Sequence, residues 1–170
     1  MWLTKFNEDS NLVDRILWSD ESEFKLNGAV NKHNCTYWAK QNPHVQVPIK
    51  NSRQGVMVWC GMSSRGLLGP YFFDNSFTGQ TYLTMLCEFV RPQIRQRRML
   101  FQHDGAPAHY ALQVRQWLDR NMPDRWIGRR GPHEWPARSP DLTPCDFFLW
   151  GYLKDTVYRT RFTTTGQLRG

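Results

Sequence analysis

Three aspartates occupy positions from which they could hold a metal ion together. Asp20 interrupts an apolar run that begins at Ile16, Asp104 follows the apolar run 99–101, and Asp146 opens a helical pattern. Like charges about 4 Å apart repel by roughly 4 kcal/mol at a surface-like dielectric. A bound divalent cation removes that cost, so the pattern predicts a metal site that processes phosphodiesters.

The elements around these acids follow from the apolar spacing and the turn residues. Asn27 and Gly28 predict a hairpin turn, and Thr78 is expected to begin a helix with apolar positions at helical spacing. The expected strands are 15–26, 32–39, 55–62 and 99–102, with 70–73 pairing back onto the third. One helix is expected to begin at Thr78, and two others are expected at 109–118 and 144–158. Residues 41–54 and 126–132 are expected to be loops, and 163–166 a turn-like tail.

This order of elements predicts the fold class. Antiparallel strands come first and alternating helices and strands follow, which indicates a mixed α/β sheet flanked by helices. Asp104 lies at the carboxyl end of its strand, where open α/β sheets usually carry their sites. The length of 170 residues fits one domain with a real core.

Composition limits the function classes. A net charge of +7 and a pI near 9.5 favour an anionic partner, nucleic acid first. No run approaches the roughly 18 apolar residues of a membrane span, so no membrane partner is expected. The four cysteines form no CxxC pair and are expected to be reduced and buried, which favours an intracellular protein.

Neighbouring acids and histidines leave other interpretations to weigh. Taken alone, Asp20 is best explained as a strand-end acid, and Glu21 should point to the opposite face of that strand and so is not counted as a ligand. His103 with Asp104 is similar to the histidine-aspartate metal phosphohydrolases. We set that class aside because the other histidines lack the helical spacing that its site requires.

Three blocks of sequence carry a specific resemblance. The blocks are WSDES at 18–22, QHDGAPAH at 102–109 and WPARSPDLTPCD at 135–146. In this order they resemble the signature blocks of mariner-type transposases, over nearly the whole chain. The resemblance implies a ribonuclease H-like fold, a catalytic triad of Asp20, Asp104 and Asp146, and two bound Mg²⁺ (or Mn²⁺) ions.

The same resemblance implies a metal-dependent DNA nuclease and strand transferase. Its partners would be double-stranded DNA, both transposon ends and target, with a homodimer as the candidate assembly and a nuclear location. Transposases of this family begin with helix-turn-helix modules, whereas only 1–14 precede the first expected strand here. Residues 1–170 are therefore expected to form the catalytic domain alone, truncated at its C-terminus. The alternative is a catalytically silent, transposase-derived protein that binds nucleic acid or another partner.

Basic residues suggest where DNA would lie. Arg129 and Arg130 stand in a loop with Trp126 and glycines, a combination suited to backbone phosphates and base stacking. Arg138 in the third block and His109 complete the expected DNA contacts, although His109 could equally make a helix-start hydrogen bond. The run of arginines at 91–98 is explained in part by its place at a helix C-terminus.

The third block contains two aspartates, and their positions separate their roles. Pro144 suits the first turn of a helix with Thr143 as N-cap, which puts Asp146 on the apolar face with Trp150. Asp146 is therefore expected to point inward, and Asp141 to brace the preceding loop. Asp146 could instead be a capping-box partner of Thr143, with no chemistry.

Overall fold

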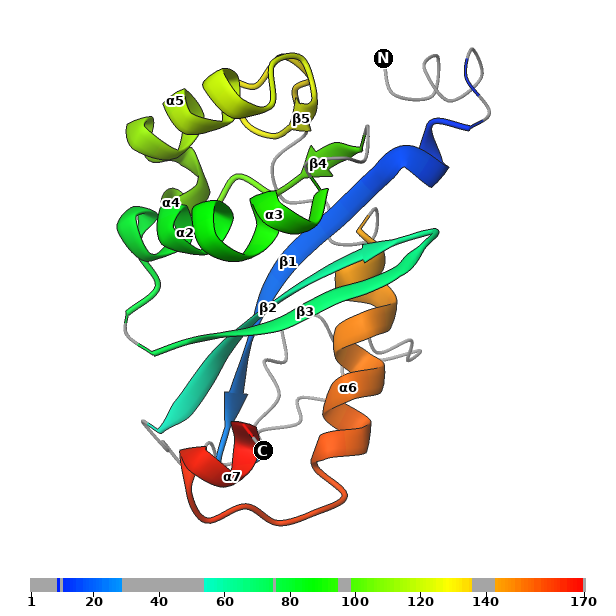
Figure 1. Ribbon diagram of the computed structural model, residues 1–170. Helices are drawn as coiled ribbons and strands as arrows, with labels where there is room; N and C mark the ends of the chain where they lie inside the picture. The colour runs from blue at the N-terminus through cyan, green and yellow to red at the C-terminus, as the bar shows by residue number, and fades with distance from the viewer. Residues whose placement is uncertain are drawn as a thin grey trace, which may run out of the picture.

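A five-stranded mixed sheet forms the centre of the molecule (Figure 1). The computed structural model describes residues 9, 11–28, 54–74, 76–94, 99–135 and 143–169. The strand order is β3-β2-β1-β4-β5. The strands are β1 (Ile16–Lys25), β2 (Gly55–Ser63), β3 (Gly66–Phe73), β4 (Leu100–Gln102) and β5 (Trp126–Ile127).

The pairing confirms the expected mixture of directions. β2 pairs antiparallel with both β1 and β3, whereas β4 runs parallel to β1 and β5 parallel to β4. The sheet therefore changes from antiparallel to parallel at β1. β1 is the long strand that both halves share.

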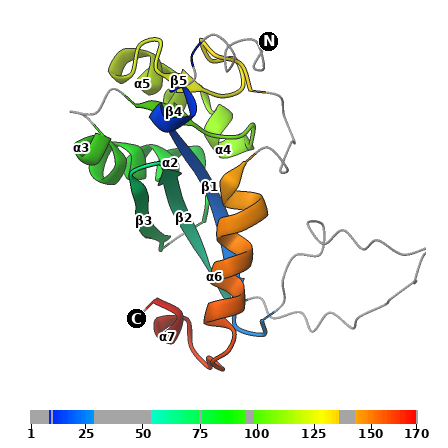
Figure 2. The ribbon, with the colours of Figure 1, turned by 90° about the vertical axis from the view of Figure 1, so that its right-hand side faces the viewer.

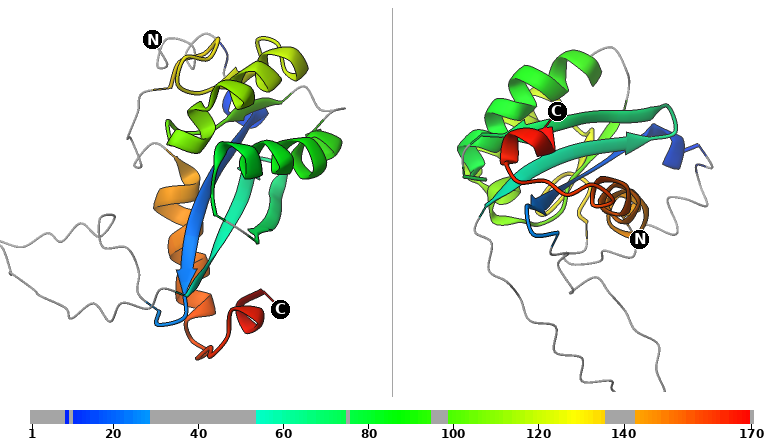
Figure 3. Two further views of the ribbon diagram at one scale, coloured as in Figure 1. Left: turned by 90° about the vertical axis from the view of Figure 1, so that its left-hand side faces the viewer. Right: turned by 90° about the horizontal axis from the view of Figure 1, so that it is seen from below.

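Helices cover both faces of this sheet (Figures 2 and 3). On one face lie α2 (Gly79–Met85), the π-helical turn η3 (Leu86–Val90), α3 (Arg91–Ile94), α4 (Pro107–Tyr110) and α5 (Leu112–Asn121). The other face carries the π-helical turn η5 (Cys145–Leu149) and α6 (Trp150–Val157). A short 3-10 turn, η1 (Val13–Arg15), precedes β1, and α7 (Thr165–Arg169) lies near β2 at the chain's end.

Side chains of successive residues in β1 point alternately towards the two helical layers. Ile16 and Trp18 belong to the core beneath α6, whereas Leu17 belongs to the core beneath α2 and α5. Side chains alternate between the two faces of a strand, so this parity continues along β1. It directs Asp20 towards α6 and Glu21 towards the opposite layer.

Most of the expected elements are confirmed, with most boundaries shifted by one or two residues, although β3 begins at Gly66, four residues before the strand expected at 70–73. Thr78 is the N-cap of α2, and its hydroxyl accepts a hydrogen bond from Thr81 N at 3.2 Å. The expected helix at 144–158 is present, with a π-helical turn in its first part. The expected strand at 32–39 lies outside the described residues.

Three expectations were wrong. Residues 126–127 form β5 instead of a loop, because β4 offers a parallel partner that a two-residue strand cannot reveal by alternation. The tail forms α7, whose Gln167 N donates to Thr164 Oγ1 at 3.3 Å. The helix expected at 109–118 is divided into α4 and α5, because Ala111 has the extended ψ of 138°.

The described part of the chain contains free cysteines and short helices. Cys60, Cys87 and Cys145 are free thiols, the first and last of them buried. No helix in the described ranges combines the length and the hydrophobicity that crossing a membrane requires.

Candidate active site

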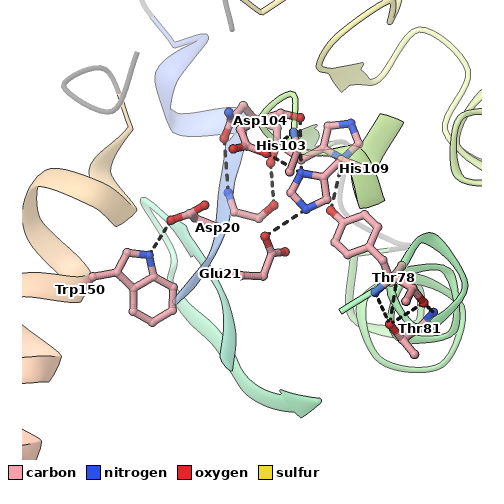
Figure 4. A network of polar contacts seen from close by, with 12 residues as sticks. Asp20, Glu21, Thr78, Thr81, His103, Asp104, His109 and Trp150 are labelled. Atoms are coloured by element: carbon pink, nitrogen blue, oxygen red, sulfur yellow. Dashed lines mark hydrogen bonds and ion pairs between the residues drawn. The ribbon is translucent and has the colours of Figure 1, made fainter. Parts of the chain in front are cut away.

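Strand register brings the first two aspartates together. β1 and β4 pair in parallel with Trp18 opposite Gln102. Continuing that register by two residues places Asp104, just beyond the end of β4, level with Asp20. Asp20 is therefore in the middle of β1 and not at a strand end. It lies where β1 extends past its shorter parallel neighbour (Figure 4).

Asp146 reaches the same place from the other helical layer. Burial raises the pKa of Asp20 well above its usual value, and the charges of Glu21, Asp146 and Asp104 add to this despite a hydrogen bond from Trp150. Burial also raises the pKa of Asp146, against hydrogen bonds from Thr143 and Asp20. The three carboxyl groups therefore lie close enough for their charges to interact.

The contacts of Asp146 tie it both to Thr143, which precedes its helix, and to Asp20. Thr143 O accepts hydrogen bonds from the backbone amides of Asp146 at 3.0 Å and Phe147 at 3.2 Å, but the N-cap of η5 is Pro144 and not the expected Thr143. The Asp146 side chain also bonds to Thr143 and to Asp20. These two side-chain bonds hold the carboxyl group at the edge of the site. Asp141 lies outside the described residues.

Trp150 holds Asp20 in place from α6. Its indole Nε1 donates to Asp20 Oδ2 at 2.7 Å (Figure 4). The indole is buried and packs edge-on against Phe24, with ring centroids 6.2 Å apart. Trp150 was expected to be a core residue. It is one, and it also orients a site carboxylate.

His109 links Asp104 to Glu21. Its Nδ1 lies 2.6 Å from Asp104 Oδ1 and its Nε2 lies 3.0 Å from Glu21 Oε2 (Figure 4). The His109 and Glu21 side chains are only 1% and 8% exposed, whereas that of Asp104 is 49% exposed. A buried charged imidazole thus connects a surface carboxylate to a buried one.

This arrangement sets the charge states of His109 and Asp104. Burial alone would lower the pKa of His109, but Glu21 and Asp104 outweigh burial and raise it to about 10. Burial alone would raise the pKa of Asp104, yet the bond and charge of His109, with the Ala106 amide, hold it below its usual value. Asp104 is therefore a carboxylate and His109 an imidazolium at neutral pH.

We expect the metal-free protein to lose stability as pH rises above neutrality. The pKa of His109 rises on folding from about 6.5 to about 10, so its contribution is complete below pH 6.5 and is lost towards pH 10. Between about pH 7 and pH 8.5 the free energy of unfolding should fall by about 1 kcal/mol per pH unit. Urea unfolding across this range measures the slope. Changing Glu21 and His109 to Gln together should flatten it, and an unchanged slope would contradict the assignment.

His103 is neutral and belongs to the packing behind the site. Burial and the nearby His109 charge hold its pKa well below the usual value. Tyr82 Oη lies 3.2 Å from His103 Nδ1, and the two histidine rings stack with centroids 4.9 Å apart. Gly128 packs against the same ring, where a Cβ would come within 2.5 Å of His103 Nε2. These contacts fix the backbone that carries Asp104.

The donor set fits a hard divalent cation, although the side chains do not yet converge on one point. Among the described residues, no three His, Cys, Asp or Glu side chains are gathered closely enough to hold an ion. Both side-chain contacts of Asp104 use Oδ1, from Ala106 N at 2.9 Å and from His109. The three candidates supply only carboxylate oxygens, which Mg²⁺ and Mn²⁺ prefer. Burial first, and then repulsion from neighbouring carboxylates, raises the pKa of Asp20 and of Asp146, as expected for acids that a cation would stabilise.

The expected DNA contacts separate into two groups. Arg129 and Arg130 are exposed in the loop after β5. His109 was expected to meet DNA, but its ring is buried between two carboxylates and cannot reach a ligand on the surface. Arg138 lies outside the described residues, as do the arginines at 95–98.

Sequence reasoning missed Glu21. It was correctly placed on the opposite face from Asp20, yet that face leads to His109 and through it to Asp104. Glu21 Oε1 is buried and has no hydrogen-bond partner among the described residues. An acid at a strand position otherwise occupied by core residues is the signal that could have identified it.

Known proteins share both the sequence and this architecture. The profile of a family described as DDE superfamily endonuclease matches residues 15–169. The Tc1 transposase of Caenorhabditis elegans is 32% identical over 151 residues, covering 81% of this chain and 50% of that protein. The chain spans about half the length of the curated relatives it matches.

Solved structures agree with the fold. The catalytic domain of the Mos1 mariner transposase superposes with a TM-score of 0.64 at 20% identity, covering 99% of this chain and 72% of that one. A Mos1 mariner paired end complex with Mn gives 0.72 at 22% identity, covering 99% and 49%. The expected ribonuclease H-like fold is confirmed. The chain belongs to the DDE superfamily endonucleases and has the catalytic-domain fold of a mariner-type transposase.

Proposed function

We propose that this domain cleaves DNA phosphodiesters and transfers DNA strands, using Asp20, Asp104 and Asp146 with two divalent ions. The observation that carries the proposal is that these three carboxyl groups, from β1, the end of β4 and η5, lie near one another at one sheet edge. Family membership supports DNA cleavage in transposition. Mos1 structures that contain Mg or Mn support Mg²⁺ or Mn²⁺ as the ions.

Each protein group would have a defined part in that chemistry. The chemistry that such ions supply when bound is activation of the attacking oxygen and stabilisation of the leaving one. Trp150 and Thr143 orient Asp20 and Asp146. His109 keeps Asp104 ionised and directs its Oδ1 inward, so that Oδ2 remains for a ligand.

The substrate proposed for this site is double-stranded DNA. Mos1 complexes with transposon ends support that class of partner, as does the net charge of +7. Cleavage of chromosomal DNA would place the protein in the nucleus. A homodimer would allow two such sites to act on two transposon ends.

A catalytically silent DNA-binding protein is the second candidate. It is favoured by the raised pKa of Asp20 and of Asp146, because a carboxyl group that protonates more readily is a poorer metal ligand. The two candidates make the same contacts with DNA and differ only in turnover.

Plasmid nicking distinguishes them. We expect the protein to relax supercoiled plasmid in Mg²⁺ or Mn²⁺ and to leave it intact in EDTA, because the carboxylates cannot act without the ions. Millimolar Mn²⁺ should also raise the melting temperature, since an ion that binds only the folded state stabilises it. An unchanged melting temperature together with intact plasmid would favour the silent protein.

A further inference from the structure

Three guanidinium groups gather around one aromatic ring beside the candidate site. The guanidinium carbons of Arg115, Arg129 and Arg130 lie 4.8, 4.6 and 5.3 Å from the centroid of the Tyr110 ring. The arginines come from α5 and from the loop after β5, and Tyr110 ends α4. We refer to these four residues as the Tyr110 platform.

The platform is built and held in place. Arg115 Nε donates to Tyr110 O at 3.2 Å, which ties α5 to the end of α4. Gly131 N bonds to Gly128 O at 3.1 Å and closes the loop that carries the other two arginines. A Cβ on Gly131 would come within 2.7 Å of the Trp126 ring, so the loop packs tightly on the buried β5. Arg130 adopts the left-handed φ of 58°, which a non-glycine residue seldom takes without such packing.

The platform concentrates positive charge. In the described part of the chain, none of the three guanidinium groups forms an ion pair with a carboxylate. Because all three surround one ring, their carbons lie within about 10 Å of one another, the screening length at 0.1 M salt. They therefore repel one another while unoccupied. Guanidinium groups match phosphate oxygens in geometry, so an anion with several phosphates would relieve this repulsion.

Its position relates it to the site. Tyr110 directly follows His109, which bonds Asp104, and Gly128 in the same loop packs on His103. A phosphate chain bound at the platform would therefore continue from the carboxylate edge.

We propose that the Tyr110 platform is a binding site for consecutive backbone phosphates of the DNA strand next to the reacting phosphodiester. Tyr110 acts as a positioning residue, because its ring, and not its hydroxyl, holds the three guanidinium groups together. This inference rests on the proposed function for its substrate and adds to it Arg115 and Tyr110, which sequence patterns did not suggest.

Salt-dependent DNA binding tests the platform without any catalysis. Affinity for a labelled duplex of about 20 base pairs would be measured in EDTA by fluorescence anisotropy at several KCl concentrations, with two unrelated sequences. We expect Arg115→Ala to reduce the slope of log K against log [salt] by about one, and Arg129→Ala with Arg130→Ala to reduce it by about two, equally on both sequences. Arg120→Ala is the matched control. It removes the same charge from an exposed position on α5, and its slope should change by much less than one.

Tyr110 variants separate the ring from the hydroxyl. Tyr110→Leu should weaken binding about as much as the double arginine variant, whereas Tyr110→Phe should bind within about twofold of the unmodified protein. If Tyr110→Leu melts at a clearly lower temperature, its weaker binding could reflect unfolding, and the arginine variants alone then test the proposal. Slopes for Arg115→Ala that match those of the unmodified protein would overturn the proposal.

The outcome is separable from that of the proposed function. Nicking in Mn²⁺ with unchanged salt slopes would overturn the platform and leave the reaction standing. Reduced slopes without any nicking would support the platform and remove the reaction.

Discussion

Asp104→Asn should lower metal-dependent DNA cleavage by about a thousand-fold or more, a barrier increase of roughly 4 kcal/mol. Asparagine has the same shape, so its oxygen can still accept the hydrogen bonds of Ala106 N and His109 Nδ1. What it loses is the negative charge, and with it the ability to bind a hard cation. Plasmid nicking in Mn²⁺ measures the effect. Thermal unfolding should show a protein that still folds cooperatively.

Asp155→Asn is the matched control, because Asp155 is exposed on α6 and makes no contact with the site. It should cleave as the unmodified protein does. Asp146→Asn should resemble Asp104→Asn and should also abolish the rise in melting temperature caused by Mn²⁺. Normal cleavage by either Asp104→Asn or Asp146→Asn would remove that residue from the triad.

His109→Gln should destabilise the fold by about 3–5 kcal/mol, the usual cost of removing one partner from a buried ion pair. The loss of stability comes from Glu21, whose side chain is only 8% exposed. Its Oε1 already lacks a hydrogen-bond partner among the described residues. Without the imidazolium, this carboxylate must either remain charged in a buried site or take up a proton. Urea unfolding near pH 7 measures the loss.

A double change tests this explanation. Glu21→Gln in the His109→Gln background should recover part of the lost stability, because it removes the uncompensated charge. His133→Gln is the control, because this half-buried ring bonds to the backbone oxygen of Asp124 at 3.0 Å; the change should cost about 1 kcal/mol or less. Additive losses for Glu21 and His109 would contradict the ion pair.

Local sequence patterns were enough for the elements that carry the three aspartates. The apolar run around Leu17 and the helical spacing from Asp146 to Trp150 each reflect burial on one face, and burial leaves a period in the sequence. The strand preceding Asp104 was found in the same way. The sheet edge where these elements meet then followed from their order.

Contacts between distant residues left no such period. Glu21 and His109 are far apart in the chain, and only the packing of α4 on the sheet joins them. β5 is two residues long and exists because β4 lies beside it. The grouping of Arg115 with Arg129 depends on the loop that Gly131 closes against Trp126, which no spacing rule describes.

The alternation along β1 constrains how this domain can evolve. Asp20 and Glu21 are neighbours in sequence but serve opposite helical layers, one through Trp150 and the other through His109. Gain or loss of a single codon between Ile16 and Asp20 would shift the strand by one residue and exchange the two faces. Asp20 would then meet the histidine layer, and the core beneath α6 would receive a buried acid. Among decaying copies of such a sequence, in-frame insertions and deletions should therefore be tolerated in the surface turns. The same changes within β1 should abolish activity.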